Sequence, residues 1–411
     1  MAALAFRYPD EILALRDGLA AFIRAEVIPR HEKHTALLDD EHRKFTSDGR
    51  YHPEVLRLMR EVRQASARAG YYAMCAPESL GGLGMGHLAW FAAWEQITTS
   101  CEGRHWLGES TLAHWAFGPS PVLAHLTPEA RERILPGLMS GETTMCFGMS
   151  EPDAGSDALM MKTRAEPDGE GWRLNGSKIW TTNSPYADHC IVFAVTDPAA
   201  AAARKGGISA FLVPTASPGF SVQRVIRMWG HAGGNEAVLG FADVRVEPHQ
   251  LVGRLHRGFA TAMLGVNLGR IYNSARAIAL GRWGIQTALE YAKLRKTFGR
   301  PIAEYQAVTF PLAESAMQIH AAHLMALNVC QLLDAGHPAR KELSMTKAYA
   351  AQAAALALDR AMQAHGALGF TNEMHLAHNF LRMRMINVAD GSNEILRRTI
   401  VGEMLDGDTD L

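Results

Sequence analysis

The sequence predicts a mainly helical protein whose middle part is a β domain. Apolar residues recur at three- and four-residue spacing from residue 10 to about residue 138, and again after Gly258. Between these regions, short strand patterns follow one another without helices, which favours an antiparallel sheet or a small barrel. We therefore expect three domains: a helical one at 1–142, a β domain at 143–254 and a second helical one at 255–411.

Composition argues against several functional classes. The chain has 411 residues, of which 48% are hydrophobic, so a large core is available. With 41 basic and 42 acidic residues, the charge gives no argument for binding nucleic acid or an anionic membrane. The start of the sequence becomes acidic too early for a signal peptide, and no apolar run reaches transmembrane length. We expect a cytoplasmic protein.

Residues that bind metals or form disulfides make no recognisable pattern. The five cysteines are scattered without a CxxC pair, and the 18 histidines include no HExxH motif. Free thiols suit a reducing compartment. We expect neither a metal nor a disulfide framework.

The N-terminal region predicts helices joined by polar segments. An amphipathic helix follows Asp10, and Pro29 closes or bends it. Residues 31–52 are strongly charged and predict a solvated loop, whereas 55–69 predict a second helix. The glycines of 77–86 lack the G-x-G-x-x-G spacing and follow a helix, so they predict a turn and not a dinucleotide-binding loop.

Strands and helices are also predicted for the rest of the chain. Asn175-Gly176 indicates a two-residue hairpin turn inside the segment 171–182. Further strands are expected at Cys146–Met149, His189–Val195, Ile208–Val213, Phe220–Val225 and Glu236–Val246. Helices are expected at Ala277–Leu294, Phe310–Leu333 and Met345–Ala364, followed by a last helix that Ser392 caps and that runs through Val401.

One stretch points to a ligand. The strand that begins at Cys146 ends in a turn rich in Pro, Asp, Gly and Ser, which closes at Asp157. Such a strand end offers outward-pointing N–H groups, and here also the hydroxyls of Ser150 and Ser156. This combination suits a planar ligand with polar edges, although an ordinary surface turn explains the spacing alone better.

Four segments together resemble the acyl-CoA dehydrogenase family, and they are spread over nearly the whole chain. They are residues 146–157, the segment NGSKIWTTN at 175–183, RKTFGRPI at 295–302 with Gln306, and QAHGALGF at 363–370 followed by DGSNEI at 390–395. The resemblance implies an N-terminal helical domain, a middle antiparallel β-barrel, a C-terminal four-helix bundle and the cofactor FAD.

The resemblance also implies which residues hold the flavin. Phe147, Met149 and Ser150 would lie along the isoalloxazine ring, with Trp180 as its wall and Thr182 as a second hydroxyl contact. A tryptophan in a strand is more often core packing, so only the resemblance supports this role for Trp180.

A second set of residues is implied to contact FAD elsewhere, several of them on a neighbouring subunit of a homotetramer or homodimer. This set comprises Arg295, Thr297, Phe298, Gln306, Gln363, Gly366, Ser392 and Glu394. The fork of an arginine suits a pyrophosphate because it binds anions bidentately, although most arginines are solvated surface charges.

Asp390 is the candidate catalytic base. Before Gly-Ser, an aspartate by itself indicates a turn or a helix start. By resemblance, Asp390 occupies the position of the glutamate that removes the α-proton of the substrate. A carboxylate is retained, and a desolvated site would raise its pKa into the useful range. Because the side chain is one methylene shorter, the reacting carbon must lie closer to this turn, which favours a repositioned or differently shaped substrate. The resemblance to family members with an aspartate base implies a branched, cyclic or substituted acyl group.

Three more residues are implied to act near the substrate. Arg270 matches an arginine that orients or balances the base, and Asn267 and Ser156 match residues that meet the acyl-CoA carrier. Some relatives carry the base at the position that is here Gly269, so no rival carboxylate stands there.

The leading hypothesis is an FAD-dependent acyl-CoA dehydrogenase that forms a 2-enoyl-CoA. Flavin would take the hydride, which no side chain can do. Electron-transfer flavoprotein is the expected electron acceptor. Two alternatives stay open: an oxygen-using enzyme that resembles nitroalkane oxidase, and a non-catalytic flavoprotein on the same scaffold.

Overall fold

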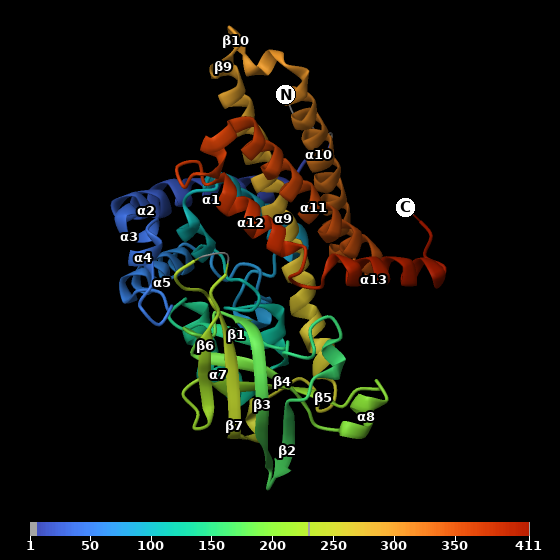
Figure 1. Cartoon of the computed structure of the whole chain (residues 1–411). Helices are drawn as coiled ribbons and strands as arrows, with labels where there is room; N and C mark the ends of the chain where they lie inside the picture. The colour runs from blue at the N-terminus through green and yellow to red at the C-terminus, as the bar shows by residue number, and fades with distance from the viewer. Residues whose placement is uncertain (1–5, 229–230, 411) are drawn as a thin grey trace. The chain divides into compact units, whose positions relative to one another are not determined.

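The computed structural model describes residues 6–228 and 231–410, and it divides into two compact units (Figure 1). Unit 1 comprises Met1–Ile28, Met85–Glu109 and Asn267–Leu411, and unit 2 comprises Pro29–Gly84 and Ser110–Val266. The three domain boundaries expected from the sequence stay a prediction. In chain order, the secondary structure is helical, then β, then helical, as expected.

Unit 1 is an assembly of packed helices. Its helices are α1 (Asp10–Phe22), α6 (Gly86–Ser100), α10 (Gln306–Asp334), α11 (Arg340–His365), α12 (Leu376–Ile386), α13 (Asn393–Leu405) and most of α9 (Gly258–Leu294). α11 packs against α10, α12 and α13. Its many buried alanines allow this, because a side chain of one carbon lets helix backbones approach closely.

Glycines let α9 join the same bundle. A Cβ atom at Gly281 would lie 2.4 Å from Ile319 of α10, and one at Gly284 would lie 2.9 Å from Leu358 of α11. Such distances are too short for real carbon contacts, so at a larger residue the side chains of Ile319 and Leu358 would have to move. The three long helices of unit 1 are therefore in direct contact.

The strands of unit 2 form one open mixed sheet and not the expected antiparallel barrel. They are β1 (Met145–Gly148), β2 (Arg164–Asp168), β3 (Gly171–Thr182), β4 (His189–Val195), β5 (Ile208–Pro214), β6 (Phe220–Val225), β7 (Glu236–Val246) and β8 (Leu251–Val252). The order is β6-β7-β3-β2-β4-β5-β8, with β1 beside β4. β1 and β4 pair in parallel, because the chain crosses over through β2 and β3 before it returns. A barrel requires continuous pairing around the ring, and the terminal strands β6 and β8 are not paired with each other in this part of the chain.

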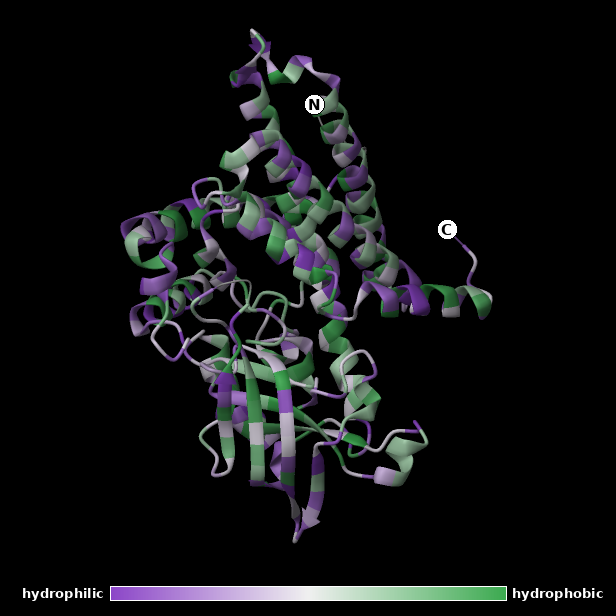
Figure 2. Ribbon diagram, viewed as in Figure 1, coloured by the Kyte–Doolittle hydropathy of each residue, from purple (hydrophilic) through white to green (hydrophobic). Residues whose placement is uncertain are grey.

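Both faces of the sheet are buried where β4 and β5 lie. One face, with Ile191 and Phe193, packs against α7 (Pro128–Met139) at Ile134. The other face, with Val192 and Phe211, packs against residues of β3 and β7. By contrast, β3 mixes hydrophilic and hydrophobic residues (Figure 2), and its buried positions are three or four residues apart in a strand with two register shifts.

The hairpin expected at Asn175-Gly176 is wrong. β3 runs without interruption from Gly171 to Thr182, and the turn lies earlier, between β2 and β3, where Gly169 has φ 62°. Asn175 instead donates from Nδ2 to Asp243 Oδ1 of β7 at 2.9 Å and accepts at Oδ1 from the backbone N–H of Asp243 at 2.8 Å. Gly176 lies at a register shift, where a Cβ would be 2.6 Å from Thr163 Oγ1. The Asn-Gly pair thus marks a bulge and not a turn.

The expected solvated loop at 31–52 is also partly wrong. It contains the short helices α3 (Thr35–Leu38) and α4 (Glu41–Lys44), and both His31 and Leu38 are buried. The expected helix at 55–69 is α5 (Pro53–Arg68). The C-terminal helices are longer than expected, since α9 begins 19 residues before Ala277, whereas the Ser392 hydroxyl accepts from Ile395 N–H and caps α13 as predicted.

Candidate functional site

Asp390 lies in unit 1, in the turn that joins α12 to α13. Its φ is 51° and that of Gly391 is 93°, so two consecutive residues adopt the left-handed conformation. Aspartate is among the few residues other than glycine that adopt this conformation readily, because its short polar side chain tolerates it. The turn aims the carboxylate at α9.

Two residues of α9 contact Asp390. Asn273 donates from Nδ2 to the carboxylate oxygen Oδ2 at 2.7 Å, and Arg270 donates from Nε to the backbone carbonyl at 3.2 Å. Arg270 also donates to Oδ1 of Asn267 at 3.3 Å. Positions three apart lie on one face of a helix, so Asn267, Arg270 and Asn273 form a single polar row. Arg270 and Asn273 are both buried.

A third contact comes from α11. The fully buried Lys347 donates from Nζ to the carbonyl oxygen of Gly391 at 2.8 Å. Arg270 and Lys347 thereby hold two successive carbonyls of the turn from two different helices. A buried ammonium group needs such partners, because burying an unpaired charge costs several kcal/mol.

Burial dominates the ionisation of this cluster. Desolvation raises the pKa of Asp390 to about 6, against the opposing effects of the Lys347 and Arg270 charges and the Asn273 hydrogen bond. Desolvation likewise lowers the pKa of Lys347 to about 8, although Asp390 favours its charged form. The result is a carboxylate whose basicity is well above that of a solvated aspartate, beside two cations.

A second group of predicted residues lies in unit 2, where β1 ends beside β3. The buried Lys178 donates to Glu151 Oε1 at 2.8 Å and to the carbonyl of Met149 at 3.0 Å. Ile179 N–H donates to the carbonyl of Ser150 at 2.9 Å. These bonds join the stretch 146–157 to the NGSKIWTTN segment, which the sequence showed only as separate motifs.

The surface beside this junction fits a flavin. Trp180 is 55% exposed and has φ 60° at a register shift of β3, so a bulge holds its large ring out toward solvent. Phe147 and Met149 are partly buried, and among the described residues the side-chain hydroxyls of Ser150 and Thr182 have no hydrogen-bond partner. An exposed aromatic face next to unused hydroxyls suits a planar ring with polar edges.

The other predicted residues are mostly at the surface. Ser156 is exposed, and Asn267 is occupied by Arg270 as described above. Of the set implied to reach FAD elsewhere, Arg295, Phe298, Gln306, Gln363, Gly366 and Glu394 are exposed, and Thr297 and Ser392 are partly buried. Thr297 and Phe298 belong to the small hairpin of β9 (Lys296–Thr297) and β10 (Arg300–Pro301).

Sequence reasoning missed four residues of these two sites: Asn273, Lys347, Lys178 and Glu151. Asn273 had a usable signal, because it follows Arg270 by three residues in the region after Gly258 that is predicted to be helical. Lys347 had a weaker one, as a charge in an alanine-rich helix. Nothing in the spacing of Lys178 and Glu151 indicates that they meet.

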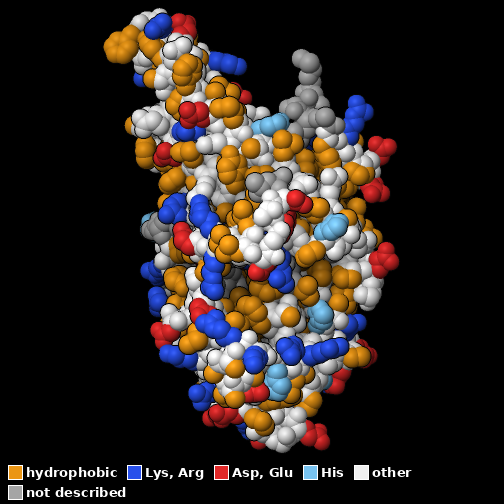
Figure 3. Space-filling view, turned by 90° about the vertical axis from the view of Figure 1, so that its right-hand side faces the viewer, with side chains coloured by type: hydrophobic (Ala, Val, Ile, Leu, Met, Phe, Trp, Pro, Cys, Tyr) orange, Lys and Arg blue, Asp and Glu red, His pale blue; other side chains and the backbone are white. Residues whose placement is uncertain are grey.

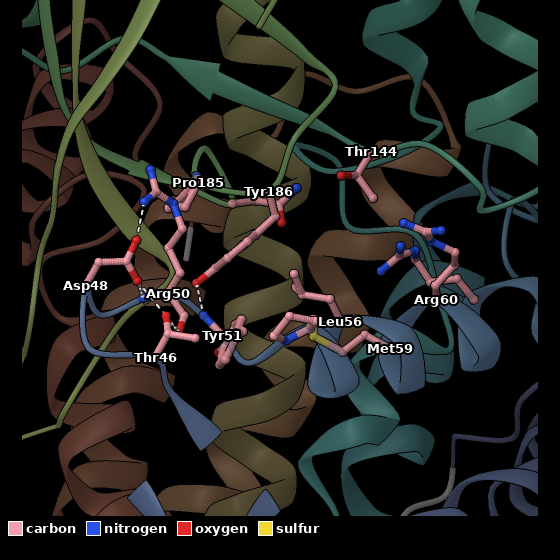
Figure 4. A pocket seen from close by; sticks show the side chains of 13 residues that line it. Thr46, Asp48, Arg50, Tyr51, Leu56, Met59, Arg60, Thr144, Pro185 and Tyr186 are labelled. Carbon is pink, nitrogen blue, oxygen red and sulfur yellow. Dashed lines mark hydrogen bonds and ion pairs between the residues drawn. The ribbon is translucent and has the colours of Figure 1, made fainter. Parts of the chain in front are cut away.

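Unit 2 also contains a cavity of about 400 Å³ that includes none of the predicted residues (Figure 4). Arg50 and Asp48 pair at its edge, and Tyr51 N–H donates to the Tyr186 hydroxyl at 2.8 Å. Arg60 lines it as well. The cavity thus lies between the loop 45–52, α5 and the residues around Asn183, which ends the NGSKIWTTN segment.

Residues 6–228 and 231–410 contain no group of three or more His, Cys, Asp or Glu side chains arranged to hold a metal ion. None of the helices within the same ranges is both long and apolar enough to cross a membrane.

Family models match almost the entire chain. The N-terminal domain model of acyl-CoA dehydrogenase matches residues 9–142, the middle domain model matches 146–244 and the C-terminal domain model matches 256–405.

Individual proteins agree with these matches. The human mitochondrial short-chain specific acyl-CoA dehydrogenase is 33% identical over 82% of this chain and 80% of its own length. The CarC subunit of the caffeyl-CoA reductase–Etf complex from Acetobacterium woodii is 30% identical over 84% of this chain and 89% of its own. Among solved structures, butyryl-CoA dehydrogenase from Megasphaera elsdenii superposes with a TM-score of 0.82 at 26% identity, covering 98% of this chain and all of that one. The chain therefore belongs to the acyl-CoA dehydrogenase family of FAD-dependent oxidoreductases.

Proposed function

We propose that this enzyme dehydrogenates an acyl-CoA thioester between its α and β carbons and that Asp390 is the base that removes the α-proton. One observation carries the assignment: a carboxylate held in a strained turn, with a pKa raised to about 6 by desolvation. A base is most effective when its pKa lies near the working pH, and a solvated aspartate is too weak for this.

The residues around Asp390 act on its position and charge. Arg270 and Lys347 hold the two carbonyls of the turn, so the carboxylate starts from a defined backbone. Their positive charges also favour the ionised form of Asp390 and oppose desolvation. A base that is desolvated but still ionised at neutral pH is the outcome of this balance.

The flavin site is proposed for unit 2. FAD, when bound, accepts the hydride that leaves the β-carbon. Trp180, Phe147 and Met149 offer apolar surface to its ring, and the hydroxyls of Ser150 and Thr182 are available for its polar edge. Lys178 supports this surface indirectly, by holding the carbonyl of Met149.

The substrate proposed for Asp390 is a branched, cyclic or substituted acyl-CoA. The support is the length of the side chain, because a base one methylene shorter than glutamate requires the reacting carbon closer to the turn. Replacing Asp390 by glutamate is the direct test. Asp390→Glu is expected to lose activity on the preferred acyl-CoA by tenfold or more and to gain relative activity on straight chains. Unchanged preference in an acyl-CoA panel would contradict this substrate class.

Self-association is proposed from the surface of unit 1. Phe310 and Met317 of α10 are 57% and 65% exposed and lie seven residues apart, hence on one face, and Phe298 at the tip of the β9–β10 hairpin is 98% exposed. α10 lies on the right-hand side of Figure 1, and Figure 3 shows the molecule from that side, with hydrophobic side chains visible on its surface. Such exposure on a helix indicates an interface, and a homotetramer or homodimer would let Arg295, Gln306 and Gln363 of one copy reach the cofactor of another.

An electron-transfer flavoprotein is the proposed electron acceptor. Its support is indirect, since one relative is named as a subunit of a complex with such a protein. The measurement is transfer of electrons from the acyl-CoA-reduced enzyme to a purified electron-transfer flavoprotein under nitrogen. If oxygen alone reoxidised the reduced enzyme as fast as electron-transfer flavoprotein does, the result would contradict the proposal.

The decisive test of the function is anaerobic reduction of the flavin. Some member of an acyl-CoA panel is expected to bleach the flavin absorbance of the wild-type enzyme, and Asp390→Asn is expected to slow this at least a thousandfold while FAD stays bound. Bleaching by simple nitroalkanes and by no acyl-CoA would instead indicate nitroalkane-oxidase-like chemistry. Equal rates in the wild type and Asp390→Asn would exclude Asp390 as the base.

A further inference from the structure

Asn273 is the only described side chain that donates a hydrogen bond to the carboxylate of Asp390. Its Nδ2 lies 2.7 Å from Oδ2, a short distance typical of a bond to a charged acceptor. The second oxygen, Oδ1, has no hydrogen-bond partner among the described residues. The two oxygens of the proposed base are therefore not equivalent.

Hydrogen bonds hold the backbone around this bond at two points. Asn273 is buried on α9, one helical turn from Arg270, whose guanidinium holds the Asp390 carbonyl. Lys347 holds the following carbonyl, that of Gly391, from α11. With the backbone held at these two points, the remaining freedom of Asp390 is rotation of its short side chain, and the Asn273 bond restricts that rotation.

We propose that Asn273 is the positioning residue of the base: it binds Oδ2 of Asp390 and leaves Oδ1 as the atom that receives the α-proton of the substrate. This inference rests on the proposed function of Asp390. The bond from carbon to the α-proton breaks, a bond from Oδ1 to that proton forms, and the electron pair stays on the substrate for the dehydrogenation. Asn273 neither gains nor loses a proton or an electron in this step.

An amide suits this task better than a charged donor. An amide N–H donates to a carboxylate without adding a full positive charge, so it orients the base without greatly weakening it. The charged and titratable groups that face the turn are Arg270 and Tyr272 on α9, Lys347 on α11 and Glu394 at the start of α13. None of these four donates to the carboxylate itself within the described residues.

The test uses flavin reduction by the best acyl-CoA, measured by stopped flow under nitrogen from pH 5 to pH 9. In Asn273→Ala, the limiting rate is expected to fall at least tenfold, because the carboxylate samples unproductive rotamers. The midpoint of the pH profile is expected to rise by about one pH unit, because the lost hydrogen bond favoured the ionised form. In Asn273→Asp, which keeps the shape but places a second carboxylate against the first, the midpoint rises further.

A structural role would give a different result. If Asn273 only supported packing, FAD content and the melting temperature would fall and the rate would drop equally at every pH, with the midpoint unchanged. Ser274→Ala is the matched control, since Ser274 is the next buried residue on α9 and bonds only to the Arg270 carbonyl of its own helix. Ser274→Ala is expected to keep the wild-type midpoint.

The outcomes separate this inference from the proposed function. An inactive Asp390→Asn together with a wild-type rate and midpoint in both Asn273 variants would overturn the positioning role alone. An active Asp390→Asn would overturn the proposed function and the positioning role with it. If Asn273→Ala fails to fold, the shape-conserving Asn273→Asp still reports the midpoint.

Discussion

At the scale of single residues, the chemistry proposed for this protein depends on a compromise at Asp390. Its left-handed backbone and the desolvation of its carboxylate both cost stability. Residues in such states persist only where their surroundings hold them, and here Arg270, Lys347 and Asn273 do so. Activity and stability are therefore expected to oppose each other at this position.

The raised pKa of Asp390 leads to a prediction about pH and stability. An aspartate in the unfolded chain ionises near 3.8, but in the folded protein burial raises the pKa to about 6. Between these values the folded state binds the extra proton, so the free energy of unfolding falls as the pH rises through this window. Above pH 6 the loss is about 3 kcal/mol at most, since one pKa unit corresponds to about 1.4 kcal/mol.

Asp390→Asn should remove this loss. We expect the variant to unfold at a higher denaturant concentration than the wild type at pH 7.5, and the difference to shrink as the pH falls toward 4. Denaturant unfolding at several pH values, on samples with equal FAD content, measures it. A variant that is less stable than the wild type at pH 7.5 would contradict the desolvation argument.

At the scale of secondary-structure elements, buried ion pairs join segments that are distant in the sequence. Glu95 of α6 is buried and forms ion pairs with Arg16 of α1 and Arg282 of α9, both at 2.6 Å, while His323 of α10 lies 3.2 Å away. Burial opposes ionisation of Glu95, but Arg282, His323 and Arg16 together lower its pKa below the usual value. One carboxylate thus links four helices of unit 1.

Glu95→Gln is expected to destabilise unit 1 by on the order of 2 kcal/mol, because the partly exposed Arg16 and Arg282 lose their hydrogen bonds to a charged carboxylate. The stabilisation by Glu95 is present above its unfolded pKa and is lost as the pH falls through the lower folded value. Thermal and denaturant unfolding measure the loss. Glu314→Gln is the control, since its pair with Arg360 is exposed and worth at most about 1 kcal/mol. Equal effects of the two changes would contradict the prediction.

A second buried pair supports the proposed flavin surface. Lys178 bonds to both Glu151 and the Met149 carbonyl, so Lys178→Met is expected to cost about 3 kcal/mol and to lower the FAD content of the purified protein. The ratio of flavin to protein absorbance measures the second effect. Lys162→Met breaks only the exposed pair with Asp153 and should change neither quantity. If the purified Lys178→Met variant contained as much FAD as the wild type, the bond to Met149 would not support cofactor binding.

At the scale of the whole molecule, the surface of unit 1 carries several exposed large hydrophobic side chains. Leu294 and Phe298 are 80% and 98% exposed at one end of the unit, and α10 exposes Phe310 and Met317 along one face. A phenylalanine with φ 51° that contacts little of its own chain has no evident role in a monomer. These residues are the basis for the proposed self-association.

Phe310→Glu is expected to weaken assembly, because a carboxylate at an apolar interface must be desolvated without a partner. Light scattering after size exclusion is expected to show a smaller particle than the wild type and, if subunits share FAD, a lower flavin content. Gln223→Glu, the addition of one negative charge at an exposed position of β6 in unit 2, is the control. If Phe310→Glu has the same particle size as the wild type, the interface lies elsewhere. A wild type that is itself a monomer would rule out self-association.

By itself, the sequence determined the order of helical and β regions, most strand boundaries and the residues that resemble a flavin signature. These features are local, because periodicity, turn residues and caps act over a few neighbouring positions, as Ser392 and strands such as His189–Val195 illustrate. Sequence also singled out Asp390 through resemblance, and the role of that residue stays a proposal.

Only the tertiary structure decided the features that depend on distant contacts. The Asn175-Gly176 pair became a bulge because Asp243 and Thr163 approach it from other parts of the chain. The β region became an open mixed sheet because β1 pairs with β4 across an intervening hairpin. The contacts of Asn273 and Lys347 with the turn at Asp390 also depend on tertiary structure, because α9 and α11 lie more than forty residues away from this turn in sequence. Local patterns carry no information about such meetings, and the packing of the whole chain determines them.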